Sequence, residues 1–297
     1  MCIRDSSGGT RTFNGAVTTG TLNILGASTA FNAATSFATG QISSGSLGGS
    51  GSVTATSSLA WTGGTMNGTG KTIIAPGAAL SISGAGVSLQ REVENNGDAN
   101  WTTGNVTFTA GTFTNQVGAV LNAESTGSFT GSGTLANLGS VQRSAMGTGT
   151  VSGLAITNTG TIGLTQGVLL LVPAGGTFSN NGAISAAAGT TLEVTGNLIQ
   201  GASSSMAISI ASNDPTTGSG HVLASGSVQL NGALSLTVLN AYTPNGANWF
   251  VRGASLSGRF STVSLPPTVF GITPRLSFSG TGVTLKFSGF PFIPASP

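Results

Sequence analysis

Four charged side chains lie close together between residues 91 and 98: Arg91, Glu92, Glu94 and Asp98. Grouped carboxylates can act as the general acid and general base that cleave a polysaccharide, or can bind a metal ion that assists the cleavage. Glu92 and Glu94 are two positions apart, so they would face the same side of a β-strand. The three acids are therefore the candidate catalytic residues if the chain is an enzyme. The alternative is a solvated turn edge in which Arg91 contacts the acids. We favour this alternative, because no histidine and no second basic residue is near the acids in the sequence.

Two tryptophans suggest a different chemistry, the binding of a glycan. Trp61 and Trp101 begin the similar segments 61–64 (WTGG) and 101–104 (WTTG). If both segments occupy the same position in a repeat, the two rings lie on one face, two coils or roughly 10 Å apart. Exposed rings at that spacing could stack on successive sugar units. The alternative, which we favour, is that each ring packs in the core or at a corner.

The chain offers little other chemistry. Its single histidine, His221, follows a Gly-Ser-Gly segment and is expected to lie on the surface, and no Gly-x-Ser-x-Gly motif is present. Cys2 is the only cysteine, so paired cysteine or histidine ligands are absent, as are calcium-binding Gly-Gly-x-Gly-x-Asp repeats. We therefore predict no catalytic residues, no metal and no cofactor.

A short pattern recurs through the middle of the chain: an apolar residue, any residue, an asparagine and, after one or two more residues, a glycine. Its asparagines are Asn95, Asn115, Asn137, Asn158 and Asn180. Their nearly constant interval of roughly 21 residues is typical of a solenoid. We expect each asparagine to adopt left-handed backbone angles and to stack its amide on the next one along the axis. The glycine that follows would then allow a tight turn.

Short apolar stretches of period two, separated by Gly and Asn, indicate strands rather than helices. The predicted fold is therefore all-β: a parallel β-helix of about 21 residues per coil, right-handed by the usual preference of large coils. Residues 7–220 are assigned to this solenoid. After about Thr217 the strands become longer, so residues 221–290 are expected to form a β-rich cap over the open strand edge.

The ends of the chain differ from the rest. Residues 1–6 (MCIRDS) resemble the in-frame translation of a sequencing adapter and are expected to be foreign to the protein. Residues 291–297 are expected to be a linker or a truncated end. No signal peptide is visible after Arg4, and no segment approaches the roughly 18 apolar residues of a membrane span. We expect the parent chain to be longer and its signal peptide to have been lost by truncation.

Charge is scarce. Sixteen of 297 residues are Lys, Arg, Asp or Glu, 5% against roughly 25% in a typical soluble domain, while glycine supplies 48 residues. The surface must therefore consist largely of hydroxyls, amides and backbone. The nine basic residues are scattered singly, whereas a nucleic-acid-binding protein needs clustered Lys and Arg. Nucleic acid is excluded as a partner.

Three features resemble bacterial surface β-solenoids, such as autotransporter passengers and filamentous-haemagglutinin-like adhesins. These are the Trp-Thr-x-Gly segments, the Asn-x-Gly spacing, and the segments 230–236 (LNGALSL) and 258–263 (GRFSTV). The resemblance covers about residues 20–290. It implies secretion or display on the bacterial cell surface, and adhesive or scaffolding work toward glycans or a host or neighbouring cell.

Three functional hypotheses follow. The first is a non-catalytic adhesin or scaffold that presents an uncharged face rich in hydroxyls and amides. The second is a polysaccharide-active β-helix enzyme, a lyase or glycoside hydrolase, that uses Glu92, Glu94 and Asp98. The third is a purely structural repeat without a ligand.

Overall fold

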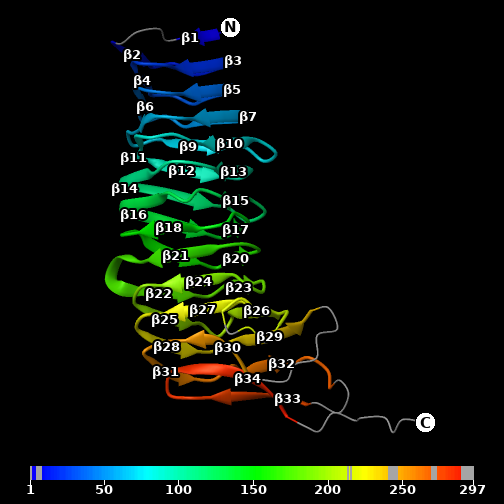
Figure 1. Cartoon of the computed structure of the whole chain (residues 1–297). Coiled ribbons are helices and arrows are strands. Elements are labelled where there is room, and N and C mark those ends of the chain that lie inside the picture. The colour runs from blue at the N-terminus through cyan, green and yellow to red at the C-terminus, as the bar shows by residue number, and fades with distance from the viewer. Residues whose placement is uncertain are drawn as a thin grey trace, which may run out of the picture.

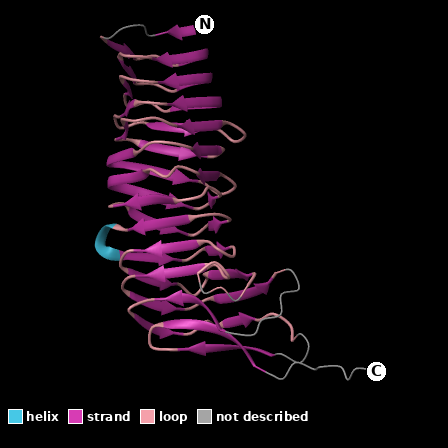
Figure 2. Ribbon diagram, viewed as in Figure 1, coloured by secondary structure: helices cyan, strands magenta, loops and turns pink. Residues whose placement is uncertain are grey.

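The chain forms a β-solenoid in which parallel strands stack in three columns along one axis (Figure 1, Figure 2). This computed structural model describes residues 2–4, 9–212, 214, 216–239, 247–268 and 273–288. Residues 291–297, expected to be a tail, lie outside the described residues. The only helix in the described chain is the 3-10 turn η1 (Ala174–Gly176). The predicted all-β parallel fold with about 21 residues per turn is confirmed.

Each coil runs through column 1, then column 2, then column 3, and every column is a ladder of strands paired in register. Column 1 contains β2 (Thr10–Phe13), β4 (Ser28–Phe31), β6 (Ser46–Gly48), β8 (Gly64–Met66), β11 (Val87–Leu89), the first parts of β14 (Val106–Asn115) and β16 (Ser128–Asn137), β18 (Thr148–Ser152), β21 (Val168–Val172), β24 (Thr191–Val194), β27 (His221–Ala224) and β30 (Ala247–Arg252).

Column 2 contains the first parts of β3 (Val17–Ile24), β5 (Thr35–Ile42) and β7 (Val53–Trp61), then β9 (Lys71–Ile74), β12 (Glu92–Asn95), the second parts of β14 and β16, β19 (Ala155–Asn158), β22 (Thr177–Asn180), β25 (Asn197–Gln200), β28 (Ser227–Leu230) and β31 (Ser255–Gly258). Column 3 contains β1 (Cys2–Arg4), the second parts of β3, β5 and β7, then β10 (Ala79–Ile82), β13 (Asp98–Trp101), β15 (Val120–Ala123), β17 (Ser140–Arg143), β20 (Thr161–Leu164), β23 (Ala183–Ala186), β26 (Ser205–Ile210), β29 (Ala233–Val238) and β32 (Thr262–Ser264).

Alternation along each strand builds the core. Successive side chains point to opposite faces of a strand, so every second residue enters the space enclosed by the three columns. In β10, for example, Leu80 and Ile82 are buried while Ala79 and Ser81 face outward. Burying one such large apolar side chain contributes roughly 1.5–3 kcal/mol.

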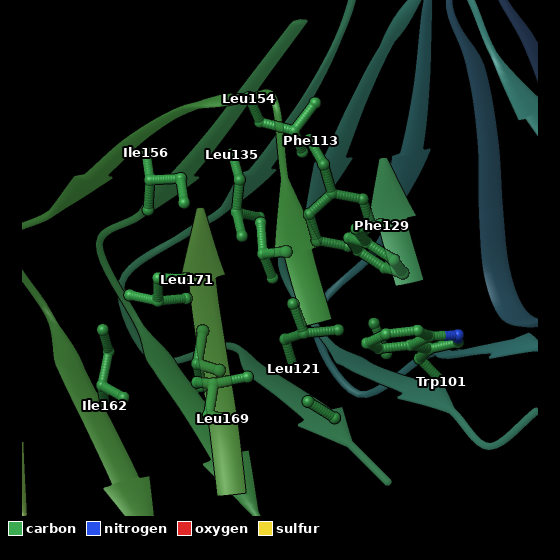
Figure 3. Close-up of a cluster of buried hydrophobic side chains, with 14 of the residues drawn as sticks. Trp101, Phe113, Leu121, Phe129, Leu135, Leu154, Ile156, Ile162, Leu169 and Leu171 are labelled. Atoms are coloured by element: carbon green, nitrogen blue, oxygen red, sulfur yellow. The ribbon is translucent and has the colours of Figure 1, made fainter. Parts of the chain in front are cut away.

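Aromatic side chains gather in the middle of the core (Figure 3). The ring of Phe129 lies 4.4 Å from that of Trp101, 5.5 Å from that of Phe108 and 6.1 Å from that of Phe113, measured between centroids. These rings come from three successive coils, so the aromatic contacts tie coils together as well as filling space.

The parallel ladders continue beyond the expected boundary between residues 220 and 221. β27 to β32 pair in parallel with the coil before them, so these strands belong to the solenoid. The pairing changes only at β33 (Thr273–Phe278) and β34 (Gly282–Ser288): β34 pairs antiparallel with β30 and with β33. Within the described residues, the cap predicted for residues 221–290 is therefore a hairpin of two strands, and it covers the end of column 1.

Residues 2–4, part of the segment expected to be foreign, form β1 and pair with residues 21–23 of β3. An unpaired strand edge accepts many sequences because the bonds are made by the backbone. The pairing is thus no evidence about the origin of residues 1–6.

Candidate functional site

The two glutamates of the candidate catalytic group share one lysine as their ion-pair partner. Glu92 and Glu94 both point outward from β12, and Lys71 is paired with Glu92 on the preceding coil. Lys71 Nζ lies 3.0 Å from Glu92 Oε1 and 3.4 Å from Glu94 Oε2. The hydrogen bond and charge of Glu92, and then those of Glu94, raise the pKa of Lys71. No second base is near the acids in the sequence, but coil stacking brings Lys71, which is 21 residues before Glu92, to their side.

Asp98 does not complete the group. It lies in β13 on column 3, past the corner that separates it from the glutamates on column 2. Among the described residues, no hydrogen bond or ion pair joins Asp98 to Glu92 or Glu94, and no group of three acid, histidine or cysteine side chains is arranged to hold a metal ion.

Arg91 does not contact the acids either. It is buried, and its guanidinium donates to two backbone carbonyls, Gly70 O from Nε and Gly51 O from Nη2, both at 3.0 Å. These carbonyls belong to the two preceding coils. Burial lowers the pKa of Arg91 to about 10. Arg91 therefore links three coils through its hydrogen bonds. The expectation that it lies in a solvated turn was wrong.

The tryptophans are in register, but both are buried. Trp61 pairs with Ile82, and Ile82 pairs with Trp101, so the two rings occupy the same inward position two coils apart. Trp61 is 0% and Trp101 1% exposed, and Trp101 Nε1 donates to Gly104 O at 2.9 Å. Neither ring offers a face to solvent, so the glycan-stacking expectation is wrong and the core alternative describes both residues.

The asparagines of the repeat form a continuous buried ladder at the corner between columns 2 and 3. In each step the Nδ2 of one asparagine donates to the Oδ1 of the next coil's asparagine. The donor–acceptor distances are 2.8 Å (Asn95 to Asn115), 2.9 Å (Asn115 to Asn137), 2.6 Å (Asn137 to Asn158) and 2.6 Å (Asn158 to Asn180). Asn180 then donates to Gln200 Oε1 at 2.8 Å, a member that the asparagine pattern did not reveal. All the amides point the same way, so each bond polarises its neighbour and strengthens the chain.

The backbone geometry at this corner differs from the prediction. Ala110 is the only described non-glycine residue with a positive φ, so the asparagines do not use left-handed angles; each is the last residue of a strand. The nearby glycines are needed for another reason. A Cβ placed on Gly160 would lie 2.0 Å from Gly139 O of the preceding coil. Glycine is required there because the stacked coils approach too closely for any side chain.

Arg143 is a buried residue that sequence reasoning missed. Nη1 donates to Ala123 O and Ser125 O at 2.7 Å, and Nη2 donates to Met146 O at 2.9 Å and Gly147 O at 3.0 Å. Burial lowers the pKa of Arg143 and Glu124 partly opposes this shift. Its position in column 3, in line with Leu164 on the next coil, marks it as inward-facing.

His221 is 2% exposed, so the expectation of a surface side chain was wrong. Its ring stacks on Trp249, with centroids 4.1 Å apart, and the Arg252 guanidinium lies 4.1 Å from the centroid of the Trp249 ring. Burial, and then the charge of Arg252, lower the pKa of His221. Trp249 belongs to the next coil, so the sequence around His221 could not reveal that a tryptophan ring packs over the histidine.

Ser219 lies 3.1 Å from His221 Nε2, but the pair is not a nucleophile and its base. Ser219 Oγ donates its single proton to Trp249 O at 3.1 Å. The imidazole Nε2–H must therefore donate to Ser219 Oγ rather than accept from it. Ser219 is also only 1% exposed, so no substrate reaches the hydroxyl.

The outward rows of column 3 form the most distinctive surface. The first row contains Thr21, Thr39, Ser58, Ala79, Asp98, Val120, Ser140, Thr161, Ala183, Ser205, Ala233 and Thr262, and the second contains Asn23, Gln41, Ala60, Ser81, Asn100, Asn122, Gln142, Gly163, Ser185, Ala207, Ser235 and Ser264. Asp98 is the one charged residue among those named, and Arg4 of β1 is in register with Asn23 at the start of the second row. At about 4.8 Å per coil the rows span roughly 50 Å. We call this surface the column 3 face.

The other two columns carry more charge on their outer sides. Lys71, Glu92 and Glu94 project from column 2, and Glu193 and Arg252 lie in column 1. The scarcity of charge in the sequence is therefore most pronounced on column 3.

No protein-family model matches the sequence, and no curated protein is detectably similar to it. Within the described residues, no helix is both long enough and apolar enough to cross a membrane. The function must therefore be argued from the geometry alone.

Proposed function

We propose that the chain is an exported bacterial surface protein that binds or scaffolds through its column 3 face and catalyses no reaction. The observation that carries this proposal is the length of that face: two rows of hydroxyl, amide and methyl groups with one carboxylate among them. Three hydrogen-bonded ladders hold the rows at fixed spacing. Many weak contacts along such a rod add up to avidity without a deep pocket.

The partner that best matches this face is a neutral glycan surface. Hydroxyl and amide groups exchange hydrogen bonds with sugar hydroxyls, and small side chains leave the face flat. A charged polymer would find almost no counter-charge on column 3. Among the side chains that the structure describes, Lys71, Glu92 and Glu94 project from column 2 and Arg252 from column 1.

Lys71 weakens the case for an enzyme. A retaining or inverting glycosidase needs two carboxylates on opposite sides of the scissile bond, one of them held protonated. Glu92 and Glu94 lie on the same side of one strand and share one ammonium group. We therefore propose no catalytic role for either residue.

The test incubates the chain with insoluble cellulose, chitin and starch and measures both the protein retained and the soluble sugar released. We expect retention without release. Ser81→Asp combined with Ser185→Asp places two charges on the column 3 face and should reduce retention. The matched pair Thr157→Asp and Ser179→Asp, equally exposed on column 2, should not.

Two results would overturn this proposal. Sugar release that disappears in the double variant Glu92→Gln/Glu94→Gln would make the protein an enzyme. Absence of retention on every polysaccharide would leave a structural repeat without a glycan ligand.

A further inference from the structure

A hollow of about 340 Å³ lies over β26, β29 and β32 of column 3. It is lined by residues 205–207, 233–235 and 262–264, and we call it the column 3 hollow. Met206 and Leu234 point inward and are almost fully buried, whereas Val263, in register with Leu234, is 44% exposed. The accessible lining therefore comes from the outward rows and from Val263. The three strands are in register: Ser205, Ala233 and Thr262 form one row of the floor, and Ala207, Ser235 and Ser264 form the other.

The hollow lies in a part of the second row where the side chains are small. Earlier in the column the second row carries Asn100 and Asn122, whose amides are bonded at 2.8 Å, and then Gln142. These long side chains stand out from the sheet. From Gly163 onward the same row contains only glycine, serine and alanine, and the hollow lies within this stretch of small residues.

Two of the three strands beneath the hollow, β26 and β29, are longer than those before them, while β32 has three residues. β26 and β29 have six residues each, whereas β20 and β23 have four. After β26 the chain turns back, with Ile210 bridged antiparallel to Ser219 and Ala211 N donating to Gly218 O at 2.7 Å. Asp214 in this turn accepts bonds from Thr216 and Thr217, which fix the loop.

The lining is mostly apolar and carries four hydroxyls, which suits a neutral ligand that has both hydroxyl groups and apolar faces. Ser205, Ser235, Thr262 and Ser264 supply hydroxyls that can both donate and accept. Methyl groups of the alanines in the two rows lie between them and can contact the apolar C–H face of a sugar ring. None of the lining residues is charged, so a uronic acid or a phosphorylated ligand would find no cation there.

We propose that the column 3 hollow is a binding subsite for a short stretch of neutral oligosaccharide that lies across the three strands. This deepens the proposed function and rests on it: the column 3 face supplies extended, weak contact, and the hollow supplies a concave site on it. The floor measures roughly 10 Å from the first strand to the third, which accommodates a few sugar rings.

The test measures binding of soluble cellohexaose, chitohexaose and maltohexaose to the full chain by titration calorimetry, with a hexamer of galacturonic acid as the charged comparison. A soluble hexamer is too short to draw on avidity along the whole face. We expect one neutral hexamer to bind and the acidic one not to bind. Ser235→Trp fills the hollow and should weaken the neutral ligand by about tenfold or more.

Thr157→Trp is the matched control, since Thr157 is as exposed as Ser235 but lies on β19 of column 2, off the column 3 face. It should leave hexamer affinity unchanged. Equal weakening by both variants, no effect of Ser235→Trp, or tighter binding of the acidic hexamer would each overturn the subsite. Retention on an insoluble polysaccharide without binding of any hexamer would overturn the subsite and leave the proposed function standing, whereas the loss of both signals would overturn both.

Discussion

The coils between residues 92 and 200 and those between residues 205 and 264 follow the same path but differ in regularity. In the first region a coil returns to the same place after a sequence separation of 22, as between the bonded residues Asn115 and Asn137. In the second region the return takes longer: Ser261 and Gly232, bonded across one coil, have a separation of 29. The additional chain extends strands and loops outside the core.

The amide ladder marks the border between the two regions. It runs from Asn95 to Gln200, and Gln200 Nε2 is buried without a partner at its end. The regular coils thus use a buried position in each turn for bonding to the next coil. The irregular coils lack that bond, and they carry the column 3 hollow and the covered His221 instead. Regular repetition stabilises the rod, and departure from it makes room for a site.

The largest loss of stability is expected for Arg143→Met in the regular region. Four backbone carbonyls lose the guanidinium that they share, and two of them belong to the preceding coil. Because buried acceptors would be left unpaired, the free energy of unfolding should fall by about 4 kcal/mol. Guanidinium chloride unfolding measures the change.

Arg252→Met in the irregular region is the control for that variant. Arg252 is exposed and contacts the Trp249 ring, so its loss should cost about 1 kcal/mol or less. If both variants lost the same free energy of unfolding, the hydrogen bonds of Arg143 would not stabilise the stacking of coils.

Asn137→Leu interrupts the ladder in its middle. Asn158 Oδ1 loses its donor and Asn115 Nδ2 loses its acceptor, while the core volume is nearly kept. We expect a loss of about 3 kcal/mol in the free energy of unfolding. Asn122→Leu removes an amide pair on the outer side of column 3, where water can replace it, and should cost less than about 1 kcal/mol. An equal cost for both would show that burial of the ladder contributes nothing.

Acid should loosen the irregular region selectively. The pKa of His221 is lowered in the folded chain, so between its ordinary value of 6.5 and the lower folded value the unfolded chain binds more protons. The stability of the folded state must then fall as the pH drops below 6.5. Between about pH 7 and pH 5, hydrogen-exchange protection factors, which correct for the slower intrinsic exchange at lower pH, should fall in β27 and β30 before they fall in β12 to β22.

His221 is the only histidine, so the variant His221→Phe should abolish this difference between the two regions. If the protection factors of β27 and β30 still fell in the variant, another group would be responsible.

The smallest effect is expected at the surface of the regular region. Lys71→Ala removes both ion pairs of the glutamate cluster, but its ammonium group and the two carboxylates are partly exposed and screened by salt. The cost should be about 0.5 kcal/mol at low salt and should vanish at high salt. A large, salt-independent loss would mean that the cluster is a buried network.

The fold could be predicted because the asparagines recur at a nearly constant interval, and a constant interval fixes both the coil length and the column in which each asparagine lies. The backbone angles could not, because the same spacing is compatible with a left-handed turn residue and with the last residue of a strand. The burial of Trp61 and Trp101 was signalled by Leu59 and Ala99, two positions earlier on the same side of the strand. The polar residues next to each tryptophan in the sequence indicated exposure more strongly than Leu59 and Ala99 indicated burial.

The environments of the charged residues could not be predicted from the sequence. Arg91 bonds Gly51 and Gly70, at sequence separations of 40 and 21, so its burial depends on how two other coils are stacked. Lys71 reaches Glu92 for the same reason. In a solenoid the neighbours that decide a side chain's environment are one full coil away, and only an accurate register brings them together.

The parallel stacking also determines how the rod responds to tension. Every hydrogen bond between stacked strands lies along the axis, and the described chain begins and ends in its outermost coils. A load applied between the two ends therefore acts on one coil at a time and peels it from its neighbour, rather than shearing all the ladders at once. Each released coil of about 21 residues adds ~70 Å of extended chain. The molecule would thus lengthen in small steps under load, and the coils joined by the buried amides would be the last to yield.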